Sequence, residues 1–129
     1  MTLTISSQHC ERLLEIAAIT PDWEVCGLLL GTAREVREVR QTRNVADAPD
    51  RTFEIDPAAL FTALREERAG GTKLIGYFHS HPTGTVAPSR TDFDRAAVDG
   101  RVWIIIAGDS LGAWQRTGGA FEPIKLVTD

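Results

Sequence analysis

The sequence predicts an α/β fold, in which a mixed, curved β-sheet is flanked by two helices and a short third helix lies at one end of the sheet. Short apolar runs alternate with two stretches of helical periodicity. The runs at residues 24–31 and 102–107 are almost continuously apolar, which is typical of strands covered on both faces. A length of 129 residues predicts one domain spanning residues 1–129.

The first helix is expected to begin at an N-cap, Ser6 or Ser7, and to end near Ile19, before the Thr20-Pro21 pair. Its apolar residues recur at helical spacing, so one face of the helix should be buried. The residues of that face are Cys10, Leu13, Leu14 and Ala17.

The second helix has a clear start and a clear end. Asp56 is suited to the N-cap and Pro57 to the first helical position, where the missing amide proton costs nothing. Gly70 and Gly71 should end the helix. Its apolar face is expected to consist of Leu60, Phe61 and Leu64.

The remaining strands are expected at residues 3–5, 34–43, 52–55, 73–81, 112–116 and 121–127. Gly76 lies inside one of them and predicts a bulge or a close backbone approach. The strand at 34–43 carries an arginine at every third position. We interpret it as a solvated edge strand, and the alternative is a basic strip that docks an acidic partner. The arginines are Arg34, Arg37, Arg40 and Arg43.

The composition limits the classes of function. A net charge of −4 argues against a general nucleic-acid binder. No apolar run approaches the roughly 20 residues that cross a bilayer, and the first residues lack the pattern of a secretory signal, so we expect a cytoplasmic protein. Cys10 and Cys26 form no Cys-x-x-Cys motif and are expected to be reduced thiols, although the sequence leaves a disulfide between them open.

The strongest chemical signal begins with two histidines at the end of an apolar run. Side chains two residues apart on a strand point to the same face, so His79 and His81 should project together. Pro82 should end the strand. Downstream, Ser89 is suited to the N-cap of a short helix expected to reach about Val98.

Asp92 falls in the first turn of that short helix. Two imidazoles and one carboxylate are a common ligand set of catalytic zinc. The alternatives are a hydrogen-bonded pair of strand histidines and a helix acid that is stabilised only by the helix dipole. His-x-His alone is a weak signal, but Pro82 and the Pro-Ser-x-x-Asp segment that ends at Asp92 make it a strong one.

This stretch resembles the signature of the JAMM (MPN-plus) metalloproteases, in which a glutamate lies upstream of His-x-His-Pro and Pro-Ser-x-x-Asp. Glu24, at the start of the run at 24–31, matches that glutamate. The resemblance covers roughly residues 3–116 and implies a fold similar to that of the cytidine deaminases. It further implies one Zn²⁺ per chain, with a catalytic water, held by the three ligand candidates His79, His81 and Asp92.

The resemblance also implies a role for two further residues. Glu24 would act as general base, and Ser89 would hydrogen-bond the tetrahedral intermediate in amide hydrolysis without a covalent intermediate. A surface acid and a plain helix cap are the simpler interpretations of these two residues. We expect no metal role for His9, a structural role for Ser80 and a core position for Cys26.

Members of this family cleave ubiquitin or its relatives, or process sulfur-carrier proteins. The chain is short, so we expect cleavage after the C-terminal Gly-Gly of a ubiquitin-like or sulfur-carrier protein, with the tail added as a strand to a sheet edge. Gly84 would allow a close substrate backbone. The alternatives are a less selective peptidase on unstructured tails and a non-catalytic scaffold. A zinc deaminase lacks support because its His-x-Glu and Pro-Cys-x-x-Cys motifs are missing, and an iron oxygenase would not need Glu24.

Overall fold

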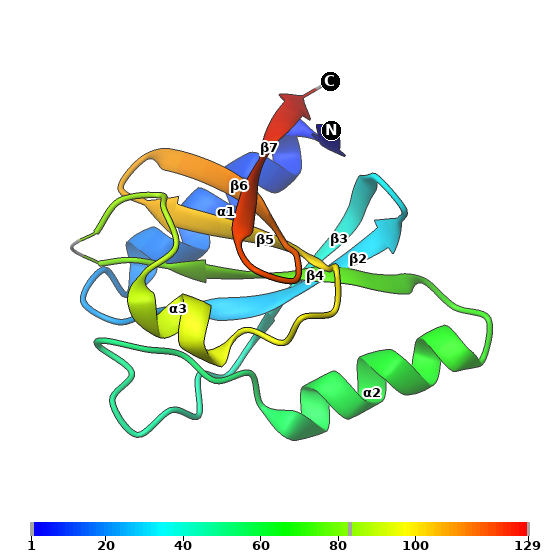
Figure 1. The fold of residues 1–129 in the computed structure, drawn as a ribbon, viewed down its shortest axis with the longest axis horizontal. Helices are drawn as coiled ribbons and strands as arrows, with labels where there is room; N and C mark the ends of the chain where they lie inside the picture. The colour runs from blue at the N-terminus through cyan, green and yellow to red at the C-terminus, as the bar shows by residue number, and fades with distance from the viewer. Residues whose placement is uncertain (1, 83, 129) are drawn as a thin grey trace.

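The computed structural model describes residues 2–82 and 84–128. The elements, in chain order, are β1 (Thr2–Ile5), α1 (Ser7–Ile19), β2 (Cys26–Thr32), β3 (Glu35–Thr42), α2 (Pro57–Arg68), β4 (Lys73–Ser80), α3 (Arg90–Arg95), β5 (Val102–Ala107), β6 (Ser110–Arg116) and β7 (Phe121–Thr128). Figure 1 shows α2 set below the strands and α3 beside the β4–β5 region. None of the helices in the described part is long and apolar enough to span a membrane.

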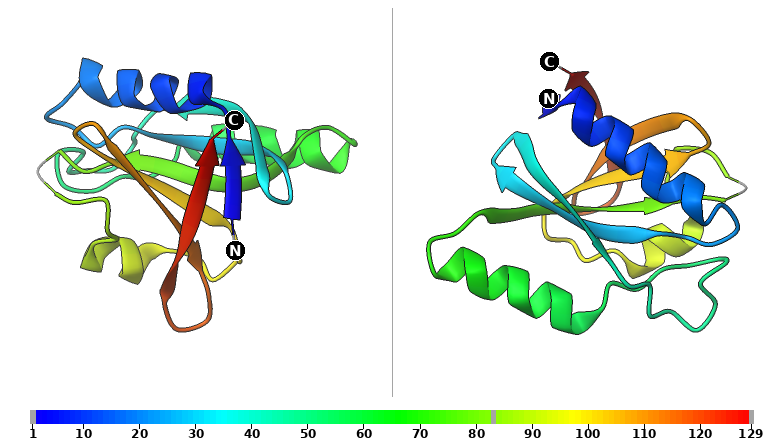
Figure 2. Two further views of the ribbon diagram at one scale, coloured as in Figure 1. Left: turned by 90° about the horizontal axis from the view of Figure 1, so that it is seen from above. Right: turned by 180° about the vertical axis from the view of Figure 1, so that it is seen from behind.

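The strands form a closed barrel in the order β1-β3-β2-β4-β5-β6-β7. The predicted mixture of parallel and antiparallel pairs is confirmed, but the curved sheet closes into a barrel, which the sequence did not predict. Closure comes from β1, which runs parallel to β7 from the pair Thr2–Lys125 to the pair Ile5–Thr128 and touches β3 at one pair. The first and last strands of the chain consequently lie side by side (Figure 2).

The central strand β2 is buried on both faces, as its apolar run predicts. Leu29 packs into the core that α1 covers, where Leu13 and Ile16 are its helical members. Leu28 and Leu30 face the other way and pack against Ala63 and its neighbours on α2. The two larger helices thus cover different faces of the sheet, which is the predicted arrangement (Figure 2).

The predicted helix starts are confirmed by their caps. The Ser6 hydroxyl accepts a hydrogen bond from the amide of His9 at 3.1 Å. The Asp56 carboxylate accepts one from the amide of Ala58 at 3.0 Å, with Pro57 in the first turn. Each such cap is worth about 1 kcal/mol of helix stability.

One predicted strand is absent, and two predicted element boundaries were wrong. Residues 52–55 form no strand and make only one isolated bridge, between Asn44 and Ile55, because this segment belongs to a loop that runs from β3 to α2. The strand β2 begins at Cys26, so Glu24 precedes it rather than opening it. The helix α3 ends at Arg95, short of Val98.

The predictions for Gly76 and for the two cysteines match the structure. Opposite Gly76 the pairing of β2 and β4 shifts register, and a Cβ atom at this glycine would lie 2.1 Å from the carbonyl oxygen of Val102. The position therefore needs glycine for the close approach of the backbone of Val102, and the predicted bulge lies beside it. Cys10 and Cys26 are both free thiols, and Cys26 is buried.

The two arginines within β3, Arg37 and Arg40, form ion pairs with glutamates. Arg37 pairs with Glu35 at 2.9 Å. Arg40 pairs with Glu38 at 2.8 Å and with Glu66 of α2 at 3.2 Å. These pairs favour the solvated-surface interpretation over a strip reserved for an acidic partner. The edge description holds only in part, since β3 pairs with β2 along its length but with β1 at one residue pair.

Candidate metal centre

The end of β4 brings the two histidines together. His79 lies inside β4, and His81 continues its pairing with β5 through a hydrogen bond from its amide to the carbonyl of Ile106 at 2.8 Å. Because alternate residues of a strand face the same way, both rings point to one side. Their Nε2 atoms are 3.1 Å apart.

The helix α3 supplies the carboxylate. Ser89 and Asp92 form a capping box, in which the Ser89 hydroxyl accepts from the Asp92 amide at 3.0 Å and Asp92 Oδ2 accepts from the Ser89 amide at 2.9 Å. The same Oδ2 atom lies 3.1 Å from His79 Nε2 and 3.0 Å from His81 Nε2. The capping box therefore aims the carboxylate at the histidines.

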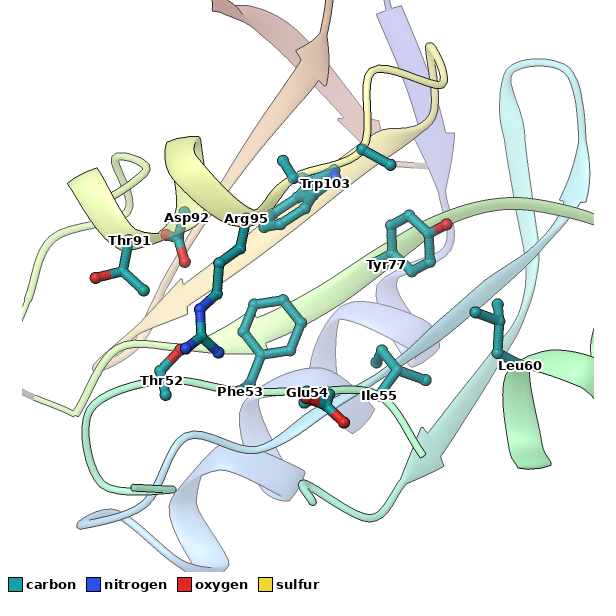
Figure 3. A pocket seen from close by; sticks show the side chains of 12 residues that line it. Thr52, Phe53, Glu54, Ile55, Leu60, Tyr77, Thr91, Asp92, Arg95 and Trp103 are labelled. Atoms are coloured by element: carbon teal, nitrogen blue, oxygen red, sulfur yellow. The ribbon is translucent and has the colours of Figure 1, made fainter. Parts of the chain in front are cut away.

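These three atoms fit a zinc ion. Tetrahedral zinc with bonds of about 2.0–2.1 Å places neighbouring ligand atoms roughly 3.3 Å apart, and the three atoms here are 3.0–3.1 Å apart. Among the described residues, one buried group of side chains could hold a metal ion, and it consists of His79, His81 and Asp92. Figure 3 shows Asp92 on α3, beside Thr91.

The two imidazole rings are oriented by their surroundings. His81 Nδ1 lies 2.7 Å from the carbonyl oxygen of Thr85, so Nδ1 carries the proton and Nε2 keeps its lone pair in the neutral ring. Phe53 stacks on the His79 ring with centroids 4.3 Å apart, and Trp103 meets it edge-on at 5.4 Å. A Cβ atom at Gly84 would lie 3.0 Å from the side chain of His81, so the glycine accommodates this ring.

The electrostatics of the triad favour an anionic Asp92 and a neutral His79. Burial would raise the pKa of Asp92, but hydrogen bonds with His79 and His81 outweigh it and hold that pKa far below its ordinary value. Burial lowers the pKa of His79, which is fully enclosed. Burial also opposes the charged form of His81, but its hydrogen bonds with Asp92 and Thr85 raise the pKa of that ring.

Glu24 lies beside the triad, and its carboxylate differs from that of Asp92 in its hydrogen bonds and in the direction of its pKa shift. It is 7% exposed, and its Oε1 atom has no hydrogen-bond partner within the described parts of the chain. Burial raises its pKa to about 7, with the charge of His81 acting against the rise and that of Asp92 adding to it. Glu24, His81 and Ser89 line one cavity of about 250 Å³. The structure thus brings together all five predicted site residues.

The sequence did not indicate what holds Glu24 in place. The Ser80 hydroxyl accepts from the amide of Val25 at 2.9 Å and donates to the carbonyl of Trp23 at 3.3 Å, so Ser80 has the structural role that we expected. The Glu24 carbonyl accepts from the side-chain amide of Asn44 at 2.8 Å. Sequence analysis did not predict this role of Asn44, and the sequence marks the residue only as the single asparagine of the chain.

A second cavity, of about 500 Å³, runs from Thr91 and Asp92 along the wall formed by Phe53 and Ile55. Figure 3 shows Tyr77 and Leu60 at its far end. This groove is lined mostly by apolar and aromatic side chains and ends at a triad residue. It can hold an extended chain whose end reaches the metal site.

Comparison with known proteins identifies relatives over most of the chain. The family described as "Prokaryotic homologs of the JAB domain" matches residues 6–117. A protein of Haloferax volcanii named "Desampylase" is 35% identical over 118 residues, which are 89% of this chain and 85% of that protein. A Thermus thermophilus protein named "Probable TtuB-protein conjugate cleaving protease" is 38% identical over 73 residues, 57% of this chain and 49% of that protein.

A solved structure of another protein has a similar fold. The solution structure of protein DSY2949 from Desulfitobacterium hafniense has a TM-score of 0.85 and 25% identity, covering 99% of this chain and 93% of that one. The family match spans both the triad and Glu24. The chain therefore belongs to the prokaryotic homologues of the JAB domain, within the JAMM/MPN family.

Proposed function

We propose that this chain, as a single domain over residues 1–129, is a zinc-dependent isopeptidase that cleaves after the C-terminal Gly-Gly of a ubiquitin-like or sulfur-carrier protein. The observation that carries the proposal is the convergence of three ligand atoms from His79, His81 and Asp92 within 3.1 Å of one another. Beside them lies the buried carboxylate of Glu24, whose Oε1 atom has no hydrogen-bond partner among the described residues. The names of the Haloferax and Thermus relatives support the same class of reaction.

His79, His81 and Asp92 would hold the zinc through the three atoms described above. Zinc bound there supplies a Lewis acid and lowers the pKa of a bound water to near 7. Glu24 accepts a proton from the attacking water and later delivers it to the leaving amine. In the metal-free protein burial raises the pKa of Glu24 to about 7, close to the range that suits a group that must both take and give a proton near neutral pH.

Ser89 can serve the helix and the reaction with one hydroxyl. The cap uses Oγ as an acceptor for the Asp92 amide, so the hydroxyl proton is available to donate. Ser89 lines the cavity that Glu24 and His81 also line. Ser89 donates a hydrogen bond through this proton, which it keeps, to the developing oxyanion of the intermediate.

The groove beside Phe53 is suited to the Gly-Gly tail. Both main-chain groups of Glu54 are bonded on one side, its amide to Asn44 Oδ1 at 3.0 Å and its carbonyl to the Val45 amide at 3.0 Å. Alternation along an extended segment directs the main-chain groups of Phe53 and Ile55 to the opposite side. A tail lying in the groove pairs with that side as an added strand, and its glycines pass the aromatic rings next to the triad.

The test is mass spectrometry of the zinc-loaded protein with a sulfur-carrier fusion that carries residues after Gly-Gly, beside a panel of unstructured peptides. The expected product is the carrier ending in Gly-Gly. Cleavage of the peptides but not the fusion would contradict the carrier-protein substrate and favour a less selective peptidase. Cleavage of neither, by a protein with full zinc, would favour a non-catalytic scaffold.

A further inference from the structure

The loop between β3 and α2 is built around Asn44. The side-chain amide nitrogen donates to the carbonyls of Glu24 at 2.8 Å and Thr52 at 3.0 Å. The side-chain oxygen accepts from the amides of Ala46 and Glu54, both at 3.0 Å. All four hydrogen-bonding positions of this side chain are therefore used, and the reversed amide would face oxygen with oxygen.

These bonds join two parts of the site that are far apart in sequence. Glu24 is held directly, by its carbonyl, and its amide donates to the carbonyl of Pro49 in the same loop at 2.8 Å. Thr52 and Glu54, two of the three other partners, line the groove that ends at Asp92. The loop also lines the smaller cavity through Asp50 and Arg51. One side chain thus fixes the groove wall relative to the backbone of Glu24.

We propose that Asn44 is a positioning residue that sets the Glu24 carboxylate against the bond to be cleaved by locking the backbone of Glu24 to the wall of the substrate groove. The proposal rests on the proposed function, because it needs Glu24 to act as the base. The hydrogen bonds of the Asn44 side chain all go to main-chain groups, and Asn44 is not among the described residues that line the cavity of about 250 Å³. It acts only through the main chain.

Backbone placement matters here because the Glu24 carboxylate lacks support of its own. Its Oε1 atom has no hydrogen-bond partner within residues 2–82 and 84–128, so no hydrogen bond to that atom corrects a shift of the backbone. A misplacement of about 1 Å can cost on the order of 10²-fold in rate. A loosened loop would move the base and the groove wall independently of each other.

The first test does not depend on activity. Hydrogen exchange of the Glu24 and Glu54 amides should be at least about tenfold faster in Asn44→Ala than in the wild type, because their acceptors lie on the loop or on Asn44 itself. Gln115→Ala is the matched control, since it removes an amide-to-carbonyl bond of 2.9 Å to Gly100, away from the site. Unchanged exchange at Glu24 in Asn44→Ala would overturn the proposal.

The second test is a double-mutant cycle on kcat in the zinc-loaded protein. Asn44→Ala should lower kcat by roughly 10–10²-fold when Glu24 is present and by less than about twofold in Glu24→Gln, because its effect passes through that carboxylate. An equal loss in both backgrounds would show a structural role only and overturn the proposal. Gln115→Ala should leave kcat unchanged.

A third variant covers the case in which Asn44→Ala does not fold. Asn44→Asp keeps the two accepted bonds and places an oxygen against the carbonyls of Glu24 and Thr52, so the cycle can be repeated with it. If the wild type with full zinc cleaves no Gly-Gly fusion, the proposed function fails. In that case the exchange measurement still decides whether Asn44 holds Glu24.

Discussion

The metal triad and the base are assembled in contrasting ways. His79, His81 and Asp92 come from one short stretch, and their ligand atoms already converge, with the aspartate held anionic. Glu24 comes from a distant part of the chain, its Oε1 atom lacks a partner in the described structure, and its pKa is raised to about 7. The triad is preorganised for an ion, whereas the base is kept reactive at a cost in stability.

The supports of the two parts differ in the same way. A strand and a capping box orient the triad, and both are local consequences of sequence. Glu24 depends on long-range bonds from Ser80 and Asn44 to its backbone and that of its neighbours. Substitutions can therefore remove metal binding and proton transfer separately, and the predictions below exploit that separation.

The largest effect is expected from breaking the triad. His79→Ala, His81→Ala and Asp92→Ala should each abolish stoichiometric zinc and all hydrolysis, because two ligands rarely hold catalytic zinc. Elemental analysis of the purified proteins measures this. His9→Ala, which changes the remaining histidine on α1, should retain one zinc per chain. Full zinc occupancy in any two triad variants would rule out the ligand assignment.

Ser89→Ala should have the next largest effect, because Ser89 belongs to both parts of the site. Loss of a hydrogen bond to the oxyanion is worth about 10²-fold in kcat. Loss of the cap to Asp92 should lower the free energy of unfolding by about 1 kcal/mol. Turnover assays and thermal unfolding separate the two contributions. Unchanged turnover with a lower melting temperature would make Ser89 a structural residue only.

Filling the groove should weaken binding and leave the chemistry intact. Ala97 is exposed and lines the groove, so Ala97→Trp should raise KM for a Gly-Gly fusion by roughly tenfold with little change in kcat. Ala33→Trp, in the turn between β2 and β3, is the control of equal size. Identical KM values for the two variants would place the tail elsewhere.

The smallest effect concerns the stability of the metal-free protein. The pKa of Glu24 is raised from 4.5 to about 7, so the folded state keeps a proton that the unfolded chain loses, and stability falls as pH rises through this window. Glu24→Gln lacks this loss. Its melting temperature should exceed that of the wild type by roughly 3 °C at about pH 8 and by much less at about pH 5.

The control for this pH dependence is Glu11→Gln, at an exposed position on α1. It removes a carboxylate that is not enclosed beside the triad. A difference between Glu24→Gln and the wild type that is the same at both pH values would show that the ionised carboxylate costs the fold nothing.

The sequence predicts those features that depend on local rules. The alternation of β4, the cap at Ser89 and the burial of β2 on both faces each follow from residues close together in the chain, and the structure has all three. The barrel was not predictable in this way, because closure depends on β1 pairing with β7 at the far end of the chain. The segment at 52–55 misled us because its alternating pattern occurs in a loop, where all four residues line the groove.

The long-range supports of the base escaped prediction for the same reason. Nothing near Asn44 in sequence indicates that its amide reaches Glu24, since the contact exists only once β2 and β3 are paired. Glu24 itself was found only through the family resemblance and the unusual position of a glutamate before an apolar strand. Its unpaired oxygen and raised pKa become visible only in the folded chain.

The central claim is that the triad binds zinc and that Glu24 transfers the proton. Its most direct test is a zinc titration of the metal-free wild type and of Glu24→Gln, with zinc binding and cleavage of a Gly-Gly fusion measured in the same samples. Both proteins should bind one zinc per chain. Wild-type activity should rise until one equivalent has been added, and the activity of Glu24→Gln should stay ~10²–10⁴-fold lower throughout. Cleavage without zinc, or zinc-loaded Glu24→Gln within a few-fold of the wild type, would contradict the account.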